Sequence, residues 1–315
     1  MIAAQSIRKV GICGIGQMGA AAAIAFQRGG YEVLLWARNA GKLDAVKATV
    51  AELNDWMDEH VGPQPQEGGS IRFETELTCL DEEADLLMDC IAEDMDQKVD
   101  LFLALERSRE RGACFITTTS GLSITDLGRR SHCGERLAGT HFWNPPHLMP
   151  LVEVIRGEDT PDAMMDCICS VMESIGKIPV RVNRDVPGFI GNRMLHALWR
   201  EAIFMVQEGI ATPADIDKVA RLTFGMRMPV VGPLENMDVV GLDLVETIHD
   251  FLLASLSDDK QVMRGLREKT EKNQMGVKSG HGFYDWSVRD AADLIERRNS
   301  QIVRQLDYLR KSGDL

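Results

Sequence analysis

Residues 11–19, GICGIGQMG, decide the fold of this chain. A short apolar run that predicts a strand leads into this stretch from Lys9, and an alanine-rich helical pattern follows it to Arg28. A G-x-G-x-x-G pattern places glycines at 14, 16 and 19. Gly14 suits a tight strand-to-helix turn, Gly16 lets the backbone approach a pyrophosphate, and Gly19 lets the helix pack closely on the strand. The stretch predicts dinucleotide binding, and a structural turn that binds nothing is the alternative.

Strand and helix patterns alternate through the first half of the chain. After EVLLWA (32–37), strand-like runs occur at 85–91, 114–119, 137–143, 151–155 and 178–182, with helical patterns between them and a loop at 61–70. This alternation predicts an α/β fold with a Rossmann-type, doubly wound, mostly parallel sheet. From Pro187 onward the patterns are helical. We expect a dinucleotide-binding domain over 1–184 and an all-α substrate and dimerisation domain over 185–315.

Charge and composition exclude several classes of protein. The chain has 35 Lys and Arg against 48 Asp and Glu, a formal net charge of -13, so nucleic acid and anionic membranes are not expected partners. Its seven cysteines include no C-x-x-C pair and no zinc-like spacing, so we predict reduced thiols and no metal site. The apolar N-terminal stretch is interrupted by glycines and Gln17 and does not read as a signal peptide, which favours the cytoplasm.

The end of the second predicted strand lacks an expected acid. An Asp or Glu there would bind the ribose 2′-hydroxyl of NAD, but this chain has Arg38 and Asn39, with Lys42 close behind. A guanidinium can pair with a 2′-phosphate and stack on adenine. The substitution favours NADP(H). NAD(H), with a water in place of the acid, and a solvated surface arginine are the alternatives.

Several further motifs lie in order along the chain. These are TTTSGLSITDL (117–127), GTHFWNPPHLMPLVEV (139–154), DVPGFIGNR (185–193) and GVKSGHGFYDW (276–286). Through them the chain resembles the 3-hydroxyacyl-CoA dehydrogenase family over nearly its whole length. The resemblance implies a nicotinamide-dependent dehydrogenase acting on a CH–OH group.

The resemblance also implies roles for individual residues. His141 corresponds to the catalytic histidine, Glu153 to its partner acid, Ser120 to the serine on the substrate carbonyl, and Asn192 to an asparagine lining the site. The residues expected to bind cofactor are Gly14, Gly16, Gln17, Met18, Gly19, Arg38, Asn39, Glu93, Lys98, Asn144 and Lys278.

These residue types fit hydride transfer on chemical grounds as well. Oxidation of an alcohol requires a base for the hydroxyl proton, and imidazole titrates in the useful range. A carboxylate can fix the tautomer of His141, while Ser120 and Asn192 can donate to the substrate oxygen. Each also has an ordinary structural alternative, as a core histidine, a strand acid, a turn serine or a helix-end amide. His147 and Arg200 are further candidates for substrate contact, with surface or interface positions as their alternatives.

The chain departs from the CoA-dependent pattern in one segment. Residues 47–70 are acidic and poor in lysine where CoA-dependent members carry a lysine-rich helical excursion, and Gly121 follows the serine. We therefore expect a subgroup acting on free carboxylic acids or other small hydroxy compounds, such as gulonate, carnitine or pyridine-ring substrates, with hydride transfer at a 3-hydroxy/3-oxo carbon or a comparable alcohol. A 3-hydroxyacyl-CoA dehydrogenase is the first alternative, and a non-catalytic cofactor sensor or crystallin-like protein is the second. Apolar stripes such as MLHALWREAIFMV (194–206) predict a homodimer through the helical domain, and a purely internal core is the alternative.

Overall fold

The structure is a computed structural model that describes residues 4–64 and 68–315. The chain forms two compact units, Met1–Arg193 and Met194–Leu315. The domain boundary near 184 remains a prediction from sequence, and residues 185–193 belong to the first unit in the structure. The predicted fold class, a Rossmann-type sheet followed by helices, is confirmed.

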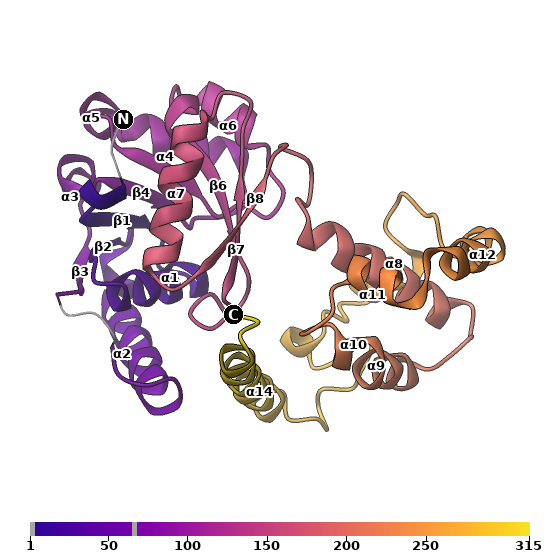
Figure 1. Cartoon of the computed structure of the whole chain (residues 1–315). Helices are drawn as coiled ribbons and strands as arrows, with labels where there is room; N and C mark the ends of the chain where they lie inside the picture. The colour runs from indigo at the N-terminus through magenta and orange to yellow at the C-terminus, as the bar shows by residue number, and fades with distance from the viewer. Residues whose placement is uncertain (1–3, 65–67) are drawn as a thin grey trace. The chain divides into compact units, whose positions relative to one another are not determined.

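The first unit contains an eight-stranded sheet with the order β3-β2-β1-β4-β5-β6-β7-β8 (Figure 1). The strands are β1 (Lys9–Cys13), β2 (Glu32–Trp36), β3 (Ser70–Glu74), β4 (Leu86–Asp89), β5 (Cys114–Thr117), β6 (Leu137–Phe142), β7 (Leu151–Ile155) and β8 (Ile178–Val182). The first six are parallel, β7 pairs antiparallel with β6, and β8 pairs parallel with β7. The strand order reverses between β1 and β4, so a crevice for a ligand is expected at their carboxyl ends.

Strand β3 was not predicted from the sequence. It follows the predicted loop at 61–70, of which residues 65–67 lie outside the described residues. Its residues, SIRFE, are each only partly buried or exposed because β3 lies at the edge of the sheet. An edge strand has no continuous apolar run, and for this reason its pattern is weak.

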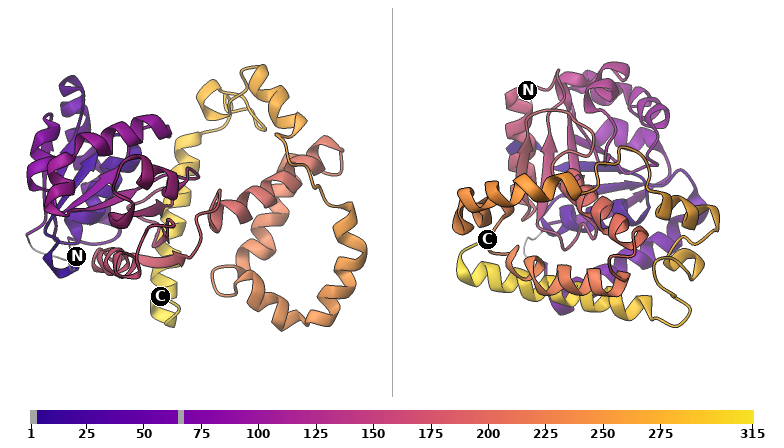
Figure 2. Two further views of the ribbon diagram at one scale, coloured as in Figure 1. Left: turned by 90° about the horizontal axis from the view of Figure 1, so that it is seen from above. Right: turned by 90° about the vertical axis from the view of Figure 1, so that its right-hand side faces the viewer.

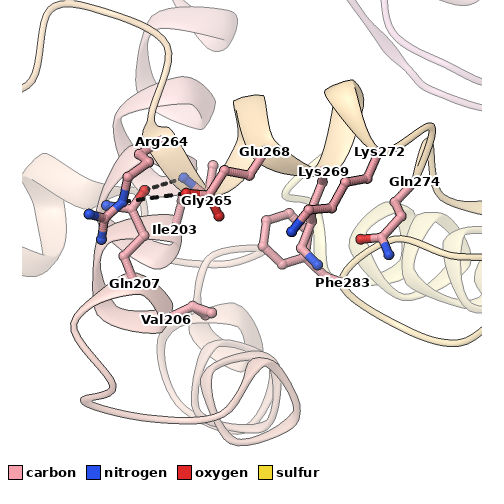
Figure 3. Close-up of a pocket in the computed structure, with 10 residues that line it drawn as sticks. All are labelled: Ile203, Val206, Gln207, Arg264, Gly265, Glu268, Lys269, Lys272, Gln274 and Phe283. Carbon is pink, nitrogen blue, oxygen red and sulfur yellow. Dashed lines mark hydrogen bonds and ion pairs between the residues drawn. The ribbon is translucent and has the colours of Figure 1, made fainter.

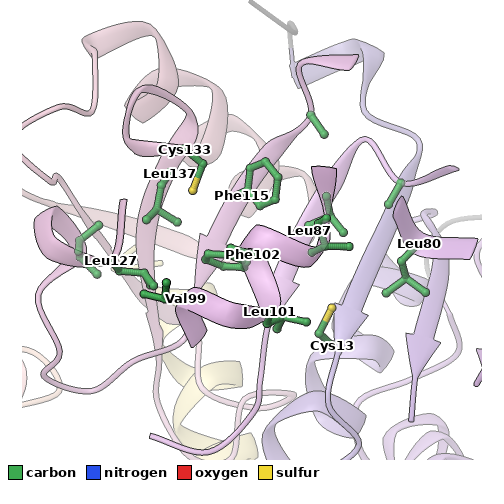
Figure 4. Close-up of a cluster of buried hydrophobic side chains, with 14 of the residues drawn as sticks. Cys13, Leu80, Leu87, Val99, Leu101, Phe102, Phe115, Leu127, Cys133 and Leu137 are labelled. Carbon is green, nitrogen blue, oxygen red and sulfur yellow. The ribbon is translucent and has the colours of Figure 1, made fainter. Parts of the chain in front are cut away.

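Helices cover both faces of this sheet (Figures 1 and 2). One layer contains α1 (Gln17–Arg28), α2 (Leu43–His60) and α7 (Asp162–Ser174), and the other contains α3 (Leu77–Glu83), α4 (Met95–Ala104), α5 (Glu106–Arg111) and α6 (Ile124–Arg130). Strand residues alternate between the layers. Leu87, Phe115 and Leu137 pack with Phe102 of α4 and Leu127 of α6 (Figure 4). This continuous core holds the carboxyl ends of the strands in place.

The second unit is helical. It contains most of α8 (Gly191–Gln207), then α9 (Pro213–Leu222), α10 (Phe224–Arg227), α11 (Pro233–Val240), α12 (Leu242–Leu252), α13 (Arg264–Glu271) and α14 (Ala291–Ser312). Two isolated bridges connect His281 to Gly276 and Asp285. Within residues 4–64 and 68–315, no helix has the length and apolar character needed to cross a membrane.

Candidate active site

The glycine turn between β1 and α1 has the geometry of a phosphate-binding turn. Gly14 has a φ of +123°, and a Cβ there would lie 2.5 Å from the carbonyl oxygen of Cys90. A Cβ on Gly19 would lie 1.9 Å from the carbonyl oxygen of Gly14, so α1 can approach the strand only with glycine at this position. Gly16 faces open space, and among the described residues no side chain caps the N-terminus of α1. The unpaired N–H groups at this helix end fit a pyrophosphate.

The polar residues after β2 follow the carboxyl end of the strand that is next to β1 in the sheet. Arg38 is exposed, and it has no hydrogen-bond or ion-pair partner among the described residues. The side chain of Asn39 accepts a hydrogen bond from the N–H of Gly41 at 2.9 Å. Asn39 therefore caps the short helical turn Ala40–Lys42, while Arg38 stays available to a ligand.

Asn144 lies close to the glycine turn. Its Oδ1 accepts a hydrogen bond from Gln17 Nε2 at 3.4 Å, and the Asn144–Pro145 peptide is cis. The structure thus brings together two residues, 127 positions apart, that the sequence analysis assigned to cofactor binding. Met18, the next residue in α1, is partly exposed at the same turn.

Glu93 and Lys98 belong to one polar network, in which Lys98 is buried and Glu93 is exposed. Lys98 is fully buried and its Nζ donates to Asp89 Oδ1, and it lies 3.7 Å from Glu93 Oε2. Burial raises the pKa of Asp89 even though the Lys98 ammonium opposes this effect. Glu93 Oε1 accepts hydrogen bonds from Thr119 Oγ1 at 2.5 Å and from Ser120 N at 2.8 Å. Glu93 therefore positions the turn that carries Ser120, and Lys98 reaches this turn through Glu93.

His141 and Glu153 form a buried pair. They are direct cross-strand neighbours on β6 and β7, and His141 Nδ1 lies 2.6 Å from Glu153 Oε2. A carboxylate accepts hydrogen bonds, so Nδ1 carries the proton and Nε2 is left for a substrate. Glu153 Oε1 accepts from the backbone N–H groups of Ile190 at 2.8 Å and Gly191 at 3.0 Å. Burial alone raises the pKa of Glu153, but the bonds from His141, Gly191 and Ile190 together hold it below its ordinary value.

Ser120 and Asn192 also lie together. Asn192 Nδ2 donates to the carbonyl oxygen of Ser120 at 3.3 Å. The preceding residue, Gly191, binds Glu153, so the first turn of α8 connects the serine turn to the His141–Glu153 pair. The structure therefore brings together all four residues that we predicted to be catalytic, although their roles remain predictions.

Three further residues were predicted to contact substrate or cofactor. His147 lies in the loop between β6 and β7, where its ring is edge-on to Trp56 of α2 at 6.2 Å. Arg200 and Lys278 belong to the second unit. There Arg200 Nη1 donates to the carbonyl oxygen of Asp259 at 3.4 Å, and Lys278 is exposed in the turn Val277–Ser279. Their predicted contacts with substrate and cofactor remain predictions.

Sequence reasoning missed several residues around the pair. The rings of Trp143 and Phe189 lie 5.2 Å and 5.7 Å from the His141 ring. Lys177 is buried before β8 and donates to the carbonyl oxygens of Pro146 at 2.6 Å and Met149 at 2.8 Å. Its burial lowers the pKa of Lys177 to about 8. The motif DVPGFIGNR was a signal for Phe189, but no residue pattern marked Lys177 as buried.

Two other features bear on ligands. No cluster of potential metal ligands occurs among the residues the structure describes. A separate pocket of about 250 Å³ lies within the second unit, where Arg264, Lys269 and Lys272 line it together with Phe283 (Figure 3). None of our predicted site residues lines this pocket.

A doubly wound sheet with a phosphate-binding turn at its switch point and a His–Glu pair in the same unit defines a nicotinamide-dependent dehydrogenase. The chain belongs to the 3-hydroxyacyl-CoA dehydrogenase family. The family's NAD binding domain matches residues 9–186, and its C-terminal domain matches residues 188–286.

Known proteins of this family resemble the chain along most of its length. The 5-formyl-3-hydroxy-2-methylpyridine 4-carboxylate 5-dehydrogenase of Mesorhizobium japonicum is 32% identical over 298 residues, 94% of this chain and 96% of that protein. A probable 3-hydroxybutyryl-CoA dehydrogenase of Bacillus subtilis is 35% identical over 290 residues, 90% of this chain and 99% of that protein. A solved structure of a 5-formyl-3-hydroxy-2-methylpyridine 4-carboxylic acid 5-dehydrogenase, an NAD+ dependent dismutase, superposes with a TM-score of 0.91 at 31% identity, covering 96% of this chain and 99% of that one.

These relatives are dehydrogenases. This chain is therefore a nicotinamide-dependent oxidoreductase that acts on hydroxyl groups, and the prediction of an enzyme rather than a cofactor sensor is confirmed.

Proposed function

We propose that the enzyme exchanges a hydride between nicotinamide and a small hydroxy or oxo acid that carries no CoA, and that it prefers NADP(H). The bound nicotinamide supplies the hydride acceptor or donor. His141 Nε2 takes the hydroxyl proton during oxidation and returns it during reduction, while Glu153 holds Nδ1–H and stabilises the imidazolium. Ser120 and Asn192 donate to the substrate oxygen. The observation that carries this proposal is the buried His141–Glu153 pair at 2.6 Å.

The charge of α2 supports a substrate without CoA. The helix has five exposed acidic residues and one lysine, Lys47; the acids are Asp44, Glu52, Asp55, Asp58 and Glu59. The phosphates of CoA would meet like charge on this helix. The TM-score of 0.91 with an enzyme named for a pyridine carboxylate supports the same substrate class.

The NADP(H) preference is a difference that we propose between this chain and the solved relative, which is described as NAD+ dependent. Arg38 is exposed and unpartnered among the described residues, and no acid follows β2 at positions 37–39. A 2′-phosphate would accept charge-assisted hydrogen bonds from this guanidinium.

The test compares substrates and cofactors in one design. NADPH and NADH are each oxidised with acetoacetyl-CoA, with free acetoacetate and with a pyridine-ring aldehyde that bears a carboxylate. We expect the highest kcat/KM for NADPH with a free acid. The variant His141→Ala should bind NADPH normally and lose most turnover. Efficient use of acetoacetyl-CoA would instead assign a 3-hydroxybutyryl-CoA dehydrogenase activity, the activity for which the Bacillus subtilis relative is named, and full activity of His141→Ala would overturn the catalytic assignment.

We also propose that the helical unit forms a homodimer. Large apolar side chains are exposed on its helices, among them Met226 at 69%, Leu234 at 74%, Val239 at 79% and Phe251 at 69%. An apolar surface of this kind favours a self-complementary interface. Light scattering at micromolar concentration should give twice the mass of the chain, and Val239→Glu should lower it. A wild-type monomer under these conditions would contradict the proposal.

A further inference from the structure

The turn Gly188–Gly191 lies directly against the acidic member of the His141–Glu153 pair. We propose that Phe189 is a positioning residue whose left-handed backbone aims the N–H groups of Ile190 and Gly191 at Glu153, and so holds Glu153 as the carboxylate that accepts from His141 Nδ1. This inference rests on the proposed role of His141 in proton transfer.

The backbone of the turn carries the first part of the argument. Gly188 has a φ of +77°, and Phe189 has a φ of +50°. Glycine adopts this region easily, but a bulky residue does so only where its surroundings impose it. Successive backbone N–H groups in such a turn converge on one anion. Here they converge on Glu153 Oε1, at 2.8 Å from Ile190 N and 3.0 Å from Gly191 N.

The Phe189 side chain explains why the turn keeps this conformation. Phe189 is only 2% exposed and belongs to a cluster of buried hydrophobic side chains in the first unit. Its ring lies 5.7 Å from the ring of His141. A Cβ on Gly191 would lie 2.2 Å from Trp143, so the indole packs directly on the Gly191 backbone. Burial of the Phe189 side chain and packing of Trp143 on Gly191 both restrict the turn.

The preceding linker is also fixed within the first unit. Asp185 Oδ2 accepts hydrogen bonds from Ser123 Oγ at 2.8 Å and from Thr125 N at 2.9 Å. After the turn, Asn192 binds the carbonyl oxygen of Ser120 at 3.3 Å. The turn is therefore anchored on both sides of Phe189, and rotation of the Ile190 and Gly191 amides would need the loss of these contacts.

The sign of the electrostatic effect follows from these bonds. Backbone N–H groups at the start of a helix carry partial positive charge, which stabilises a carboxylate and disfavours an added proton on a nearby imidazole. Loss of these groups raises the proton affinity of the pair. The other charged groups on neighbouring elements form their hydrogen bonds with residues outside the His141–Glu153 pair. These partners are Thr119 and Ser120 for Glu93, Asp89 for Lys98, Pro146 and Met149 for Lys177, Asp166 for Arg181, Ser123 and Thr125 for Asp185, and Pro187 for Arg193.

A pair of substitutions at Phe189 separates the backbone from the ring. Phe189→Gly removes the ring but permits the left-handed conformation, whereas the β-branched side chain of Phe189→Val disfavours it. The His141 titration is followed by NMR in the cofactor-free enzyme, with His141→Gln to assign the signal. We expect the midpoint of the His141 titration to be about one pH unit higher in Phe189→Val than in Phe189→Gly. This is the size of effect expected from the loss of one hydrogen bond to a charged group. Equal midpoints would overturn the inference.

A second pair keeps the test decisive if Phe189→Val does not fold. In a Trp143→Ala background, which removes the collision with a Cβ at 191, Gly191→Pro lacks the N–H that Gly191→Ala retains. Proline is tolerated at this position because Gly191 is the first residue of α8. Only the proline variant should move the His141 midpoint and the pH profile of kcat/KM upward. Retained turnover in His141→Ala would show instead that the proposed function itself is wrong.

Discussion

His141 on β6 and Glu153 on β7 are direct partners in the antiparallel pairing of the two strands, with Nδ1 and Oε2 2.6 Å apart. The reversal of β7 relative to the six parallel strands creates this pairing. Two neighbouring parallel strands are joined by a long crossover connection, usually a helix. The antiparallel strands β6 and β7 are joined by a short loop, which brings the acid and the imidazole to the same end of the sheet.

Glu153→Gln should lower kcat by about 10²- to 10⁴-fold, because glutamine cannot stabilise the imidazolium that forms during alcohol oxidation. The expected change in KM for the substrate is small. Steady-state kinetics in both directions measure the effect, and Glu158→Gln, an exposed acid paired with Arg129, is the matched control. A fall in substrate affinity with unchanged kcat would show that Glu153 binds substrate instead.

Arg38→Asp should reverse the cofactor preference. The substitution removes hydrogen bonds to the 2′-phosphate and adds a carboxylate for the ribose hydroxyl, so kcat/KM for NADPH should fall about 10- to 100-fold while that for NADH rises. Lys47→Asp makes the same charge change on the exposed surface of α2 and serves as the control. If both variants lower kcat/KM for NADPH equally, the loss comes from the change in net charge and not from a contact between Arg38 and the 2′-phosphate.

Two glycines of the turn should respond differently to alanine. Gly16→Ala adds a methyl group in open space and should cost below about 1 kcal/mol of stability while weakening cofactor binding. Gly19→Ala forces a contact of 1.9 Å with the carbonyl oxygen of Gly14 and should destabilise the fold by about 1–3 kcal/mol or more. Thermal unfolding and NADPH fluorescence titration separate the two effects. Equal loss of stability would mean that Gly16 also packs against the protein.

Lys98→Met should destabilise the first unit by about 3–5 kcal/mol, because it leaves the buried carboxylate of Asp89 without its cation. The double variant Lys98→Met, Asp89→Asn should recover much of this loss, since it removes the uncompensated charge. Urea unfolding gives the free energies of the cycle. Additive losses in the double variant would show that the two residues do not depend on each other.

Lys177 should make stability depend on alkaline pH. Its pKa in the folded protein is about 8 and its usual value is 10.5, so the unfolded chain binds more protons between these values. Stability should therefore rise with pH between 8 and 10.5, by roughly 3 kcal/mol in total, and Lys177→Met should lack this rise. Urea unfolding at several pH values measures it. Parallel pH curves for the two proteins would contradict the assignment.

Local patterns predicted much of this fold because their physical causes are local. Apolar runs marked seven of the eight strands, and only the edge strand β3, with no buried residue, was missed. The glycine spacing at 14, 16 and 19 predicted the turn, since Gly14 and Gly19 have backbone atoms too close for a side chain, while Gly16 leaves open space for a ligand.

The sequence by itself determined the fold class, the family and the residue types of the candidate site: glycines for phosphates, a histidine and an acid for proton transfer, and an arginine in place of the ribose acid. Only the tertiary structure decided what these groups touch. Lys98 turned out to be buried against Asp89, and Glu153 receives two N–H groups from residues 37 and 38 positions away. Such contacts depend on how strands reverse and turns close, and no local pattern of side chains encodes those distances.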